Sequence, residues 1–176
     1  MQAPGIVIRV ARDDELDEVS ALIDVAYAQY DAFVEGASPE RIASYEAYRI
    51  DRRDVRSRLN DSELLVAEVD DRLVGTVTFY PPTPGATAGE GWLEGWASIR
   101  LLAVHPDARG LGIGRRLTEI CVERARALGA PVLGLHTTVL MEVAKAMYER
   151  MGFVRAPEFD FRPSPDFVVE GYRLVL

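Results

Sequence analysis

The sequence has few of the side chains that build covalent or metal-based frameworks. Its 176 residues include one cysteine, Cys121, and two histidines. One cysteine cannot form an intramolecular disulfide, and a Cys-rich or His-based metal cluster needs more ligands than these. This usage fits a reducing compartment, so we expect a cytoplasmic protein without a bound metal.

Long apolar runs are also missing. No stretch approaches the roughly 18 consecutive apolar residues that a membrane-spanning helix needs. The first ten residues, MQAPGIVIRV, lack the basic and then apolar layout of a signal peptide. We therefore expect no membrane partner.

Basic residues are fewer than acidic ones, since the chain has 20 Lys and Arg and 28 Asp and Glu, which gives a net charge of −8. A nucleic-acid partner held through its phosphates needs a basic surface, so this balance argues against one. The negative charge lies early in the chain: residues 1–60 sum to −4, 61–100 to −5 and 101–176 to +1.

The pattern of apolar residues predicts one domain over residues 1–176 with a mixed α/β fold. The length suits a single domain, and the 48% hydrophobic content can fill its core. Alternation and helical spacing then give the elements, separated by a Pro- and Gly-rich loop at 81–91. The expected strands are 6–10, 63–69, 72–80, 92–104, 132–137, 153–161 and 166–176, and the expected helices are 13–33, 39–59, 113–128 and 139–151.

The most informative motif is Arg109-Gly110-Leu111-Gly112-Ile113-Gly114, placed between a buried strand and a helix. Alternate glycines let the backbone take positive φ and let a ligand approach it closely. The first amides of the helix lack intrahelical acceptors and form an anion site. A tight turn is the plainer interpretation, but one glycine would suffice for it. Neither the nucleotide P-loop nor the dinucleotide fingerprint matches, so the motif favours another phosphorylated ligand over ATP or NAD.

Two segments resemble the GNAT superfamily of acyl-CoA-dependent N-acyltransferases. The segment LLAVHPDARGLGIGRRL (101–117) is similar to its pyrophosphate-binding motif, and AKAMYERMGFVR (144–155) is similar to its second motif. They occur in the family's order with one strand between them, and the order of elements agrees over nearly the whole chain. The resemblance implies a mainly antiparallel sheet of about seven strands flanked by four helices and splayed between strands 4 and 5.

The resemblance also implies a binding site for acetyl-CoA as acyl donor. Arg115 would lie beside the phosphates, and Leu102 and Val104 would bond the pantetheine arm through their main chains. The arm carries two amides that need partners when buried, which agrees with this placement. The backbone amides for the pyrophosphate would come from Arg109, Gly110, Leu111, Gly112, Ile113 and Gly114.

The resemblance implies a catalytic acid in this sequence but no single catalytic base. Tyr148 lies where the family's tyrosine protonates the CoA sulfur, although it could also be a core aromatic. Many members carry an acid where this chain has Ser98. Glu94 is the nearest acid and lies on the same strand face if alternation holds. Glu94, His136 and a water relay remain the alternatives for the base. A further departure is Met141, where many members place an asparagine.

Two functions remain open at this stage. The first is an N-acetyltransferase that moves an acetyl group from acetyl-CoA to a primary amine by direct attack in a ternary complex. The second is a non-catalytic acyl-CoA-binding regulatory module. Ser98 and Met141 support this alternative, because they depart from the residues that many family members carry at these positions. The early negative charge favours a cationic small-molecule or peptide amine as acceptor. Homodimers are common in the family, so a homodimer is a further expectation.

Overall fold

The structure is a computed structural model that describes residues 5–83 and 91–176. Residues 84–90 of the predicted loop therefore lie outside the described part. The α-helices are α1 (Leu16–Tyr27), α2 (Pro39–Arg53), α3 (Val55–Arg58), α4 (Ile113–Ala127) and α5 (Glu142–Arg150). The strands are β1 (Val7–Val10), β2 (Glu63–Val69), β3 (Arg72–Tyr80), β4 (Ala97–Val104), β5 (Val132–Thr137), β6 (Val154–Arg155), β7 (Phe161–Ser164) and β8 (Phe167–Val175).

The strands form one eight-stranded sheet in the order β1-β2-β3-β4-β5-β8-β6, with β7 paired to β8. Among the described strands, β4 and β5 are the parallel pair and the other pairs are antiparallel. The predicted mixed, mainly antiparallel sheet is thus confirmed. The count exceeds seven because the expected strand 153–161 is interrupted by a short 3-10 helix at Pro157–Phe159.

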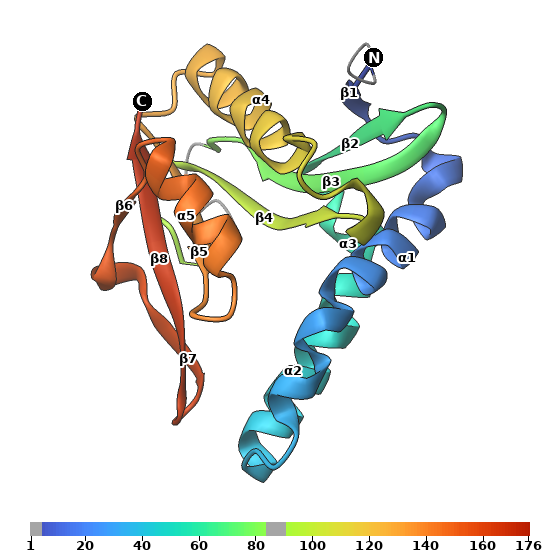
Figure 1. Cartoon of the computed structure of the whole chain (residues 1–176). Coiled ribbons are helices and arrows are strands. Elements are labelled where there is room, and N and C mark those ends of the chain that lie inside the picture. Colours follow the sequence, from blue (N-terminus) through green and yellow to red (C-terminus); the bar gives the residue numbers. More distant parts are fainter. Residues whose placement is uncertain (1–4, 84–90) are drawn as a thin grey trace.

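Helices cover both faces of the sheet (Figure 1). Strand β2 shows why, since its four central residues are apolar and buried, and they point alternately to the two faces. Leu65 and Ala67 pack in the cluster that includes the apolar side of α4, whereas Leu64 and Val66 pack in the cluster that includes α1. The two clusters place the N-terminal helices on one face and α4 with α5 on the other.

The second predicted helix divides in two, which gives five α-helices where four were expected. Asp54 leaves the helical conformation, with φ −77° and ψ 68°, and its side chain accepts a hydrogen bond from the Ser57 amide at 3.2 Å. An aspartate in this role starts a new helix, so α3 follows α2 directly. The Arg58 guanidinium donates to the carbonyls of Asp51 and Arg52 and so satisfies the end of α2.

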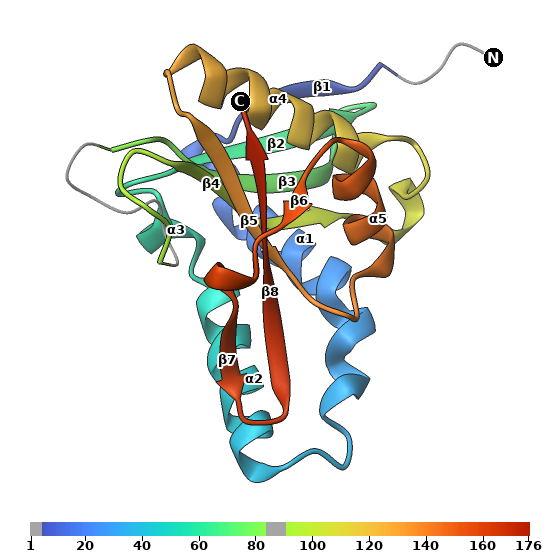
Figure 2. The ribbon, with the colours of Figure 1, turned by 90° about the vertical axis from the view of Figure 1, so that its left-hand side faces the viewer.

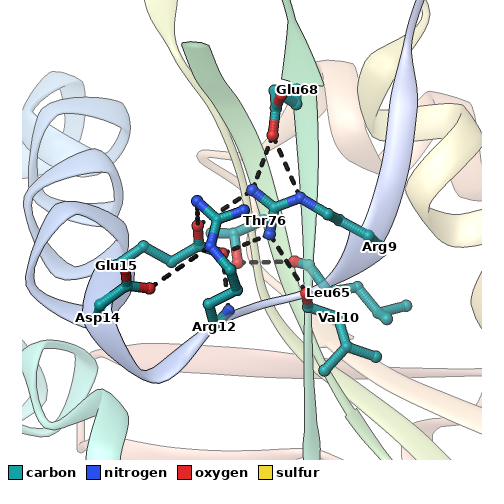
Figure 3. Close-up of polar contacts among 8 residues, drawn as sticks. All are labelled: Arg9, Val10, Arg12, Asp14, Glu15, Leu65, Glu68 and Thr76. Atoms are coloured by element: carbon teal, nitrogen blue, oxygen red, sulfur yellow. Dashed lines mark hydrogen bonds and ion pairs between the residues drawn. The ribbon is translucent and has the colours of Figure 1, made fainter. Parts of the chain in front are cut away.

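Arg9 joins the first strand to its neighbours (Figure 3). Its guanidinium donates to both carboxylate oxygens of Glu15, at 2.6 and 3.0 Å, and to Glu68 on β2 at 2.7 Å. The amide of Arg12 also donates to Glu15, at 2.8 Å. These hydrogen bonds, led by that from Arg9, hold the pKa of the buried Glu15 carboxyl below its usual value. The cluster fixes the start of α1 against the edge of the sheet.

Helix α2 and the β7–β8 hairpin both extend beyond the sheet, as Figures 1 and 2 show from two sides. They meet near their far ends, where Arg41 forms an ion pair with Asp166 at 3.2 Å. There the ring centroids of Phe33 and Phe167 are 4.9 Å apart. In the described part of the chain, every helix is too short or too polar to traverse a bilayer.

Candidate active site

Strands β4 and β5 pair over a short length and then separate. Their register joins Ala97 with Leu133, Ser98 with Gly134 and Ile99 with Leu135, and it records no pair beyond Ile99. Leu101 has a positive φ of 53°, and the β3–β4 register shifts between Thr76 and Thr78. Such an irregularity bends a strand. The rest of β4 therefore turns away from β5, which is the splay that the resemblance implies.

The glycine turn leads from this open end of β4 into α4. Gly110 and Gly112 have φ of 81° and 77°, and a Cβ at either position would meet nothing within 4 Å. The first helical hydrogen bond runs from the Arg116 amide to the Gly112 carbonyl, at 3.0 Å. The three preceding amides at the start of α4 therefore have no intrahelical acceptor. Amides without an acceptor at the start of a helix have the geometry that suits an anion, as the sequence predicts for this turn.

A cavity of about 620 Å³ occupies the space between the separated strands and this turn. Leu102 and Val104 line it from β4, and Tyr148 lines it from α5. Six of the predicted residues of the turn line it as well: Arg109, Gly110, Gly112, Ile113, Gly114 and Arg115. The structure thus brings nearly all of the expected donor-binding residues to one cavity.

Three of the predicted donor-binding residues are less well placed than the others to contact a ligand in this cavity. Leu111 is exposed and is not among the lining residues of the cavity. The Arg109 amide donates to the Pro106 carbonyl at 3.3 Å, and its side chain donates to the Ala26 carbonyl at 3.1 Å, at the end of α1. The Arg115 side chain lies toward solvent and pairs with Glu119 at 2.8 Å. The outward amides at the start of α4 are therefore better placed than the side chains of Arg109 and Arg115 to donate hydrogen bonds to an anion.

Tyr148 is only 5% exposed, on the side of α5 that faces the cavity. Its ring packs against Phe153, with the centroids 5.6 Å apart. Burial, followed by the neighbouring Tyr27, raises the pKa of the Tyr148 phenol above its usual value. The phenol therefore stays protonated at neutral pH and can act as a hydrogen-bond donor.

A second cavity of about 490 Å³ continues from the first, between α1, α2 and the β7–β8 hairpin. The two cavities share lining residues where β4 separates from β5. Leu101, His136, Thr137 and Met141 are among those that line both. A molecule in one cavity can therefore touch a molecule in the other at this junction.

His136 lies at the junction, whereas Glu94 does not. His136 Nε2 is 2.8 Å from the Phe159 carbonyl oxygen, and its ring packs on Trp92 at 4.5 Å. A carbonyl only accepts hydrogen bonds, so Nε2 carries the proton and the basic lone pair of the neutral ring is on Nδ1.

Glu94 precedes β4, which begins at Ala97 and not at residue 92, so the alternation expected to align it with Ser98 does not extend to it. The side chain is exposed and is absent from the lining of both cavities.

Thr137, at the end of β5, was not singled out by the sequence. Its side chain is 1% exposed, and its hydroxyl has no hydrogen-bond partner among the residues that the structure describes. The signal in the sequence is the polar pair His136 and Thr137, which follows the apolar run VLGL at the end of β5, before the loop to α5. A buried polar group without a partner is uncommon, and here it lines the junction.

Residues 25–153 of the chain match the model of the acetyltransferase (GNAT) family. A mycothiol acetyltransferase of Cellulomonas flavigena is 34% identical over 68% of this chain and 36% of its own length. Another, of Geodermatophilus obscurus, is 29% identical over 86% of this chain and 45% of its own length. An IAA acetyltransferase of Azospirillum brasilense is 34% identical over 60% of this chain and 63% of its own length. The chain thus covers less than two thirds of each of these relatives.

Solved structures with the same fold extend over almost the whole chain. The PaiA N-acetyltransferase of Thermoplasma acidophilum, in complex with coenzyme A, has a TM-score of 0.71 at 16% identity and covers 98% of this chain and 99% of its own. The yncA protein of Salmonella typhimurium, with its cofactor acetyl-CoA, has a TM-score of 0.63 at 19% identity and covers 97% and 94%. At such identities the likeness concerns the fold.

Proposed function

The chain belongs to the acetyltransferase (GNAT) family, and we propose that it transfers an acetyl group from acetyl-CoA to a primary amine by direct attack in a ternary complex. The observation that supports this most strongly is the pair of cavities that meet where β4 leaves β5. A donor in the larger cavity and an acceptor in the other would bring their reacting atoms together there. Such positioning accounts for a large part of the rate of a two-substrate reaction.

The larger cavity fits the chemistry of coenzyme A at two points. The outward amides of Ile113, Gly114 and Arg115 are donors for the pyrophosphate, and the open space at Gly110 and Gly112 lets it approach the backbone. The stretch of β4 at Leu102 and Val104, which has no pairing with β5, offers main-chain groups to the amides of the pantetheine arm. The match to the acetyltransferase (GNAT) family model and a structural neighbour in complex with coenzyme A are consistent with the assignment.

When bound, acetyl-CoA would supply a thioester carbonyl that a neutral amine attacks. The C–N bond forms, the C–S bond breaks, and the amine loses a proton. We assign the uptake of that proton to His136, whose basic Nδ1 belongs to a ring at the junction. Tyr148 would donate a hydrogen bond to the sulfur as negative charge develops on it. Its raised pKa makes complete transfer of the phenolic proton costly, so stabilisation of the thiolate is its main role.

Replacing Tyr148 tests this proposal. Tyr148→Phe removes one buried hydroxyl and keeps the ring, so we expect kcat to fall about 100-fold while the affinity for CoA stays unchanged. The assay is mass-spectrometric detection of the acetylated amine, with acetyl-CoA and aromatic, aliphatic and diamine acceptors. Affinity is measured by calorimetric titration with CoA.

Two outcomes would contradict the proposal in different ways. If the wild-type protein binds CoA but acetylates none of the amines, the non-catalytic acyl-CoA-binding module is the better description. If Tyr148→Phe weakens CoA binding as much as it lowers turnover, the residue is structural and the assigned role is wrong.

A further inference from the structure

The second cavity has an aromatic wall. Tyr27, Tyr30, Tyr45 and Tyr48 line it from the N-terminal helices. Tyr27 lies edge-on to Tyr30 and to Tyr48, with ring centroids 5.8 and 6.3 Å apart. Phe33, Phe161 and Phe167 line the opposite side and the far end. A flat apolar group placed in this space would meet rings from several directions.

The charges around this cavity do not match the cationic acceptor that the early acidic residues favoured. Arg41 and Arg100 both line it, and Asp51 is the one acidic side chain lining it among the described residues. Asp51 forms an ion pair with Arg100 at 3.1 Å. Arg41 forms its own pair with Asp166, and its guanidinium lies 3.6 Å from the centre of the Phe33 ring. A second ammonium group would therefore meet arginines and an already paired carboxylate.

Three other acidic residues of the N-terminal part form ion pairs outside the second cavity. Glu15 and Glu68 pair with Arg9 at the edge of the sheet, and Asp24 pairs with Arg53 at 2.6 Å on the outer side of the helices. None of these carboxylates is in the lining of the cavity. These three carboxylates thus add no negative charge to the lining of the second cavity.

We propose that the acceptor is a monoamine with an aromatic body, whose one positive charge is on the nitrogen that receives the acetyl group. This inference rests on the proposed function and specifies the class of amine that accepts the acetyl group. The ring would lie among the tyrosines and phenylalanines of the second cavity, and the nitrogen would point to the junction near Leu101 and His136. Offset and edge-on ring contacts favour such a body over an alkyl chain.

The test compares 2-phenylethylamine with 1,4-diaminobutane, and n-butylamine serves as a monoamine without a ring. We expect kcat/KM for 2-phenylethylamine to exceed that for the diamine by about tenfold or more, with n-butylamine between them. Thermal unfolding in the presence of CoA gives a second readout that needs no turnover. There the aromatic amine should add to the shift produced by CoA, and the diamine should not.

Charge reversal on α2 tests the role of the arginine. Arg41→Glu places a carboxylate at the far end of the cavity, and we expect the preference for the aromatic monoamine over the diamine to fall roughly threefold. Arg49→Glu is the matched control, because Arg49 is on the same helix, also loses an ion pair, and lies outside the lining. Its preference should equal that of the wild type.

The results separate failure of this inference from failure of the proposed function. Equal or better use of the diamine, with CoA bound and acetylation observed, would overturn the acceptor class alone. An aromatic amine that adds no shift to the CoA complex would also overturn it. Absence of any CoA-induced shift would instead refute the proposed function.

A separate observation concerns the buried hydroxyl of Thr137. Thr78 on β3 has a hydroxyl in the same condition, buried and without a partner among the described residues. The two differ in place, since Thr137 lines both cavities and Thr78 lines neither. A buried hydroxyl without a hydrogen-bond partner lowers the stability of the folded state. The place of Thr137 at the junction means that a bound ligand could supply this partner.

We infer that the Thr137 hydroxyl donates a hydrogen bond to the acyl carbonyl oxygen of the donor. The hydroxyl can rotate to face that oxygen, which becomes more negative as the amine attacks. Thr137 would then help to distinguish acetyl-CoA from free CoA. The inference depends on the donor site of the proposed function, but not on the identity of the acceptor.

Calorimetric titration with acetyl-CoA and with CoA tests this role. We expect Thr137→Val to weaken acetyl-CoA binding about fivefold and to leave CoA binding unchanged, and Thr137→Ser to keep most of the wild-type affinity. Thr78→Val removes an equivalent hydroxyl outside the cavities and should change neither affinity. Equal effects of Thr137→Val on both ligands, or no effect on either, would overturn the assignment. No binding of either ligand to the wild type would refute the donor site itself.

Discussion

Gly112 and Gly129 lie at opposite ends of α4 and offer a controlled test of the glycine turn. Both have positive φ, 77° and 74°, and at both positions an added Cβ would meet nothing within 4 Å. The cost of alanine at either position is therefore that of a left-handed backbone alone, about 1–2 kcal/mol. For a domain of this size that corresponds to a fall of roughly 2–8 °C in the midpoint of thermal unfolding. The two substitutions should destabilise the protein equally.

Their effects on CoA affinity should differ. Gly112 lines the donor cavity and precedes the outward amides of α4, whereas Gly129 does not line it. Alanine at position 112 puts a methyl group beside the anion site and favours rotation of the backbone away from positive φ. Loss of one hydrogen bond from these amides to a charged phosphate is worth about 1.5–3 kcal/mol, which is roughly 10- to 100-fold in Kd.

The assay is calorimetric titration with CoA at a temperature where both variants are folded, with unfolding followed separately. Gly112→Ala should bind CoA at least tenfold more weakly than Gly129→Ala, which should bind as the wild type does. Equal affinities of the two variants would refute the assignment of the turn as the pyrophosphate site. A large difference in stability between them would refute the argument from backbone strain.

Two further predictions concern the fold. Gly134→Ala should lower the free energy of unfolding by about 1–3 kcal/mol in denaturant titration, because its Cβ would lie 2.8 Å from ring atoms of the buried Trp92; a neutral substitution would show that the ring can move. Glu15→Gln should cost about 1–3 kcal/mol at pH 7, and this difference from the wild type should shrink as the pH falls. The folded pKa of Glu15 is lowered, so its contribution is present above the unfolded value near 4.3 and is lost below it; a difference that is constant with pH would contradict the role of this charge.

The sequence predicted the elements well where a single local rule decides them. The strands at 63–69 and 72–80 and the helix that starts at Ile113 occur as expected, because alternation, helical spacing and the glycine turn act over a few residues. Asp54 interrupts the second helix because one side chain there starts a new helix, and helical spacing continues across the break. A continuous helix and a helix broken at Asp54 both fit the local sequence, so the packing of the folded chain decides between them.

The candidate site was less predictable, for a different reason. The donor residues lie in one contiguous motif and reach the cavity together, whereas Glu94 was placed by extending alternation beyond the point where β4 begins. Thr137 was missed because an unpartnered hydroxyl is a property of its three-dimensional surroundings. The charge of residues 1–100 could not locate an acceptor site, because net charge does not record which face an acid occupies, and Glu68 and Asp24 pair with arginines outside the second cavity.

Binding of coenzyme A where β4 separates from β5 is the central claim about this protein. The most direct measurement is the midpoint of thermal unfolding with CoA, acetyl-CoA, NAD and ATP in parallel. A ligand at a hundred times its Kd adds about 2.7 kcal/mol to the stability of the folded state. We expect a clear rise in the midpoint with CoA and acetyl-CoA and a smaller rise or none with NAD and ATP. An unchanged midpoint with CoA, or an equal rise with all four ligands, would contradict this claim.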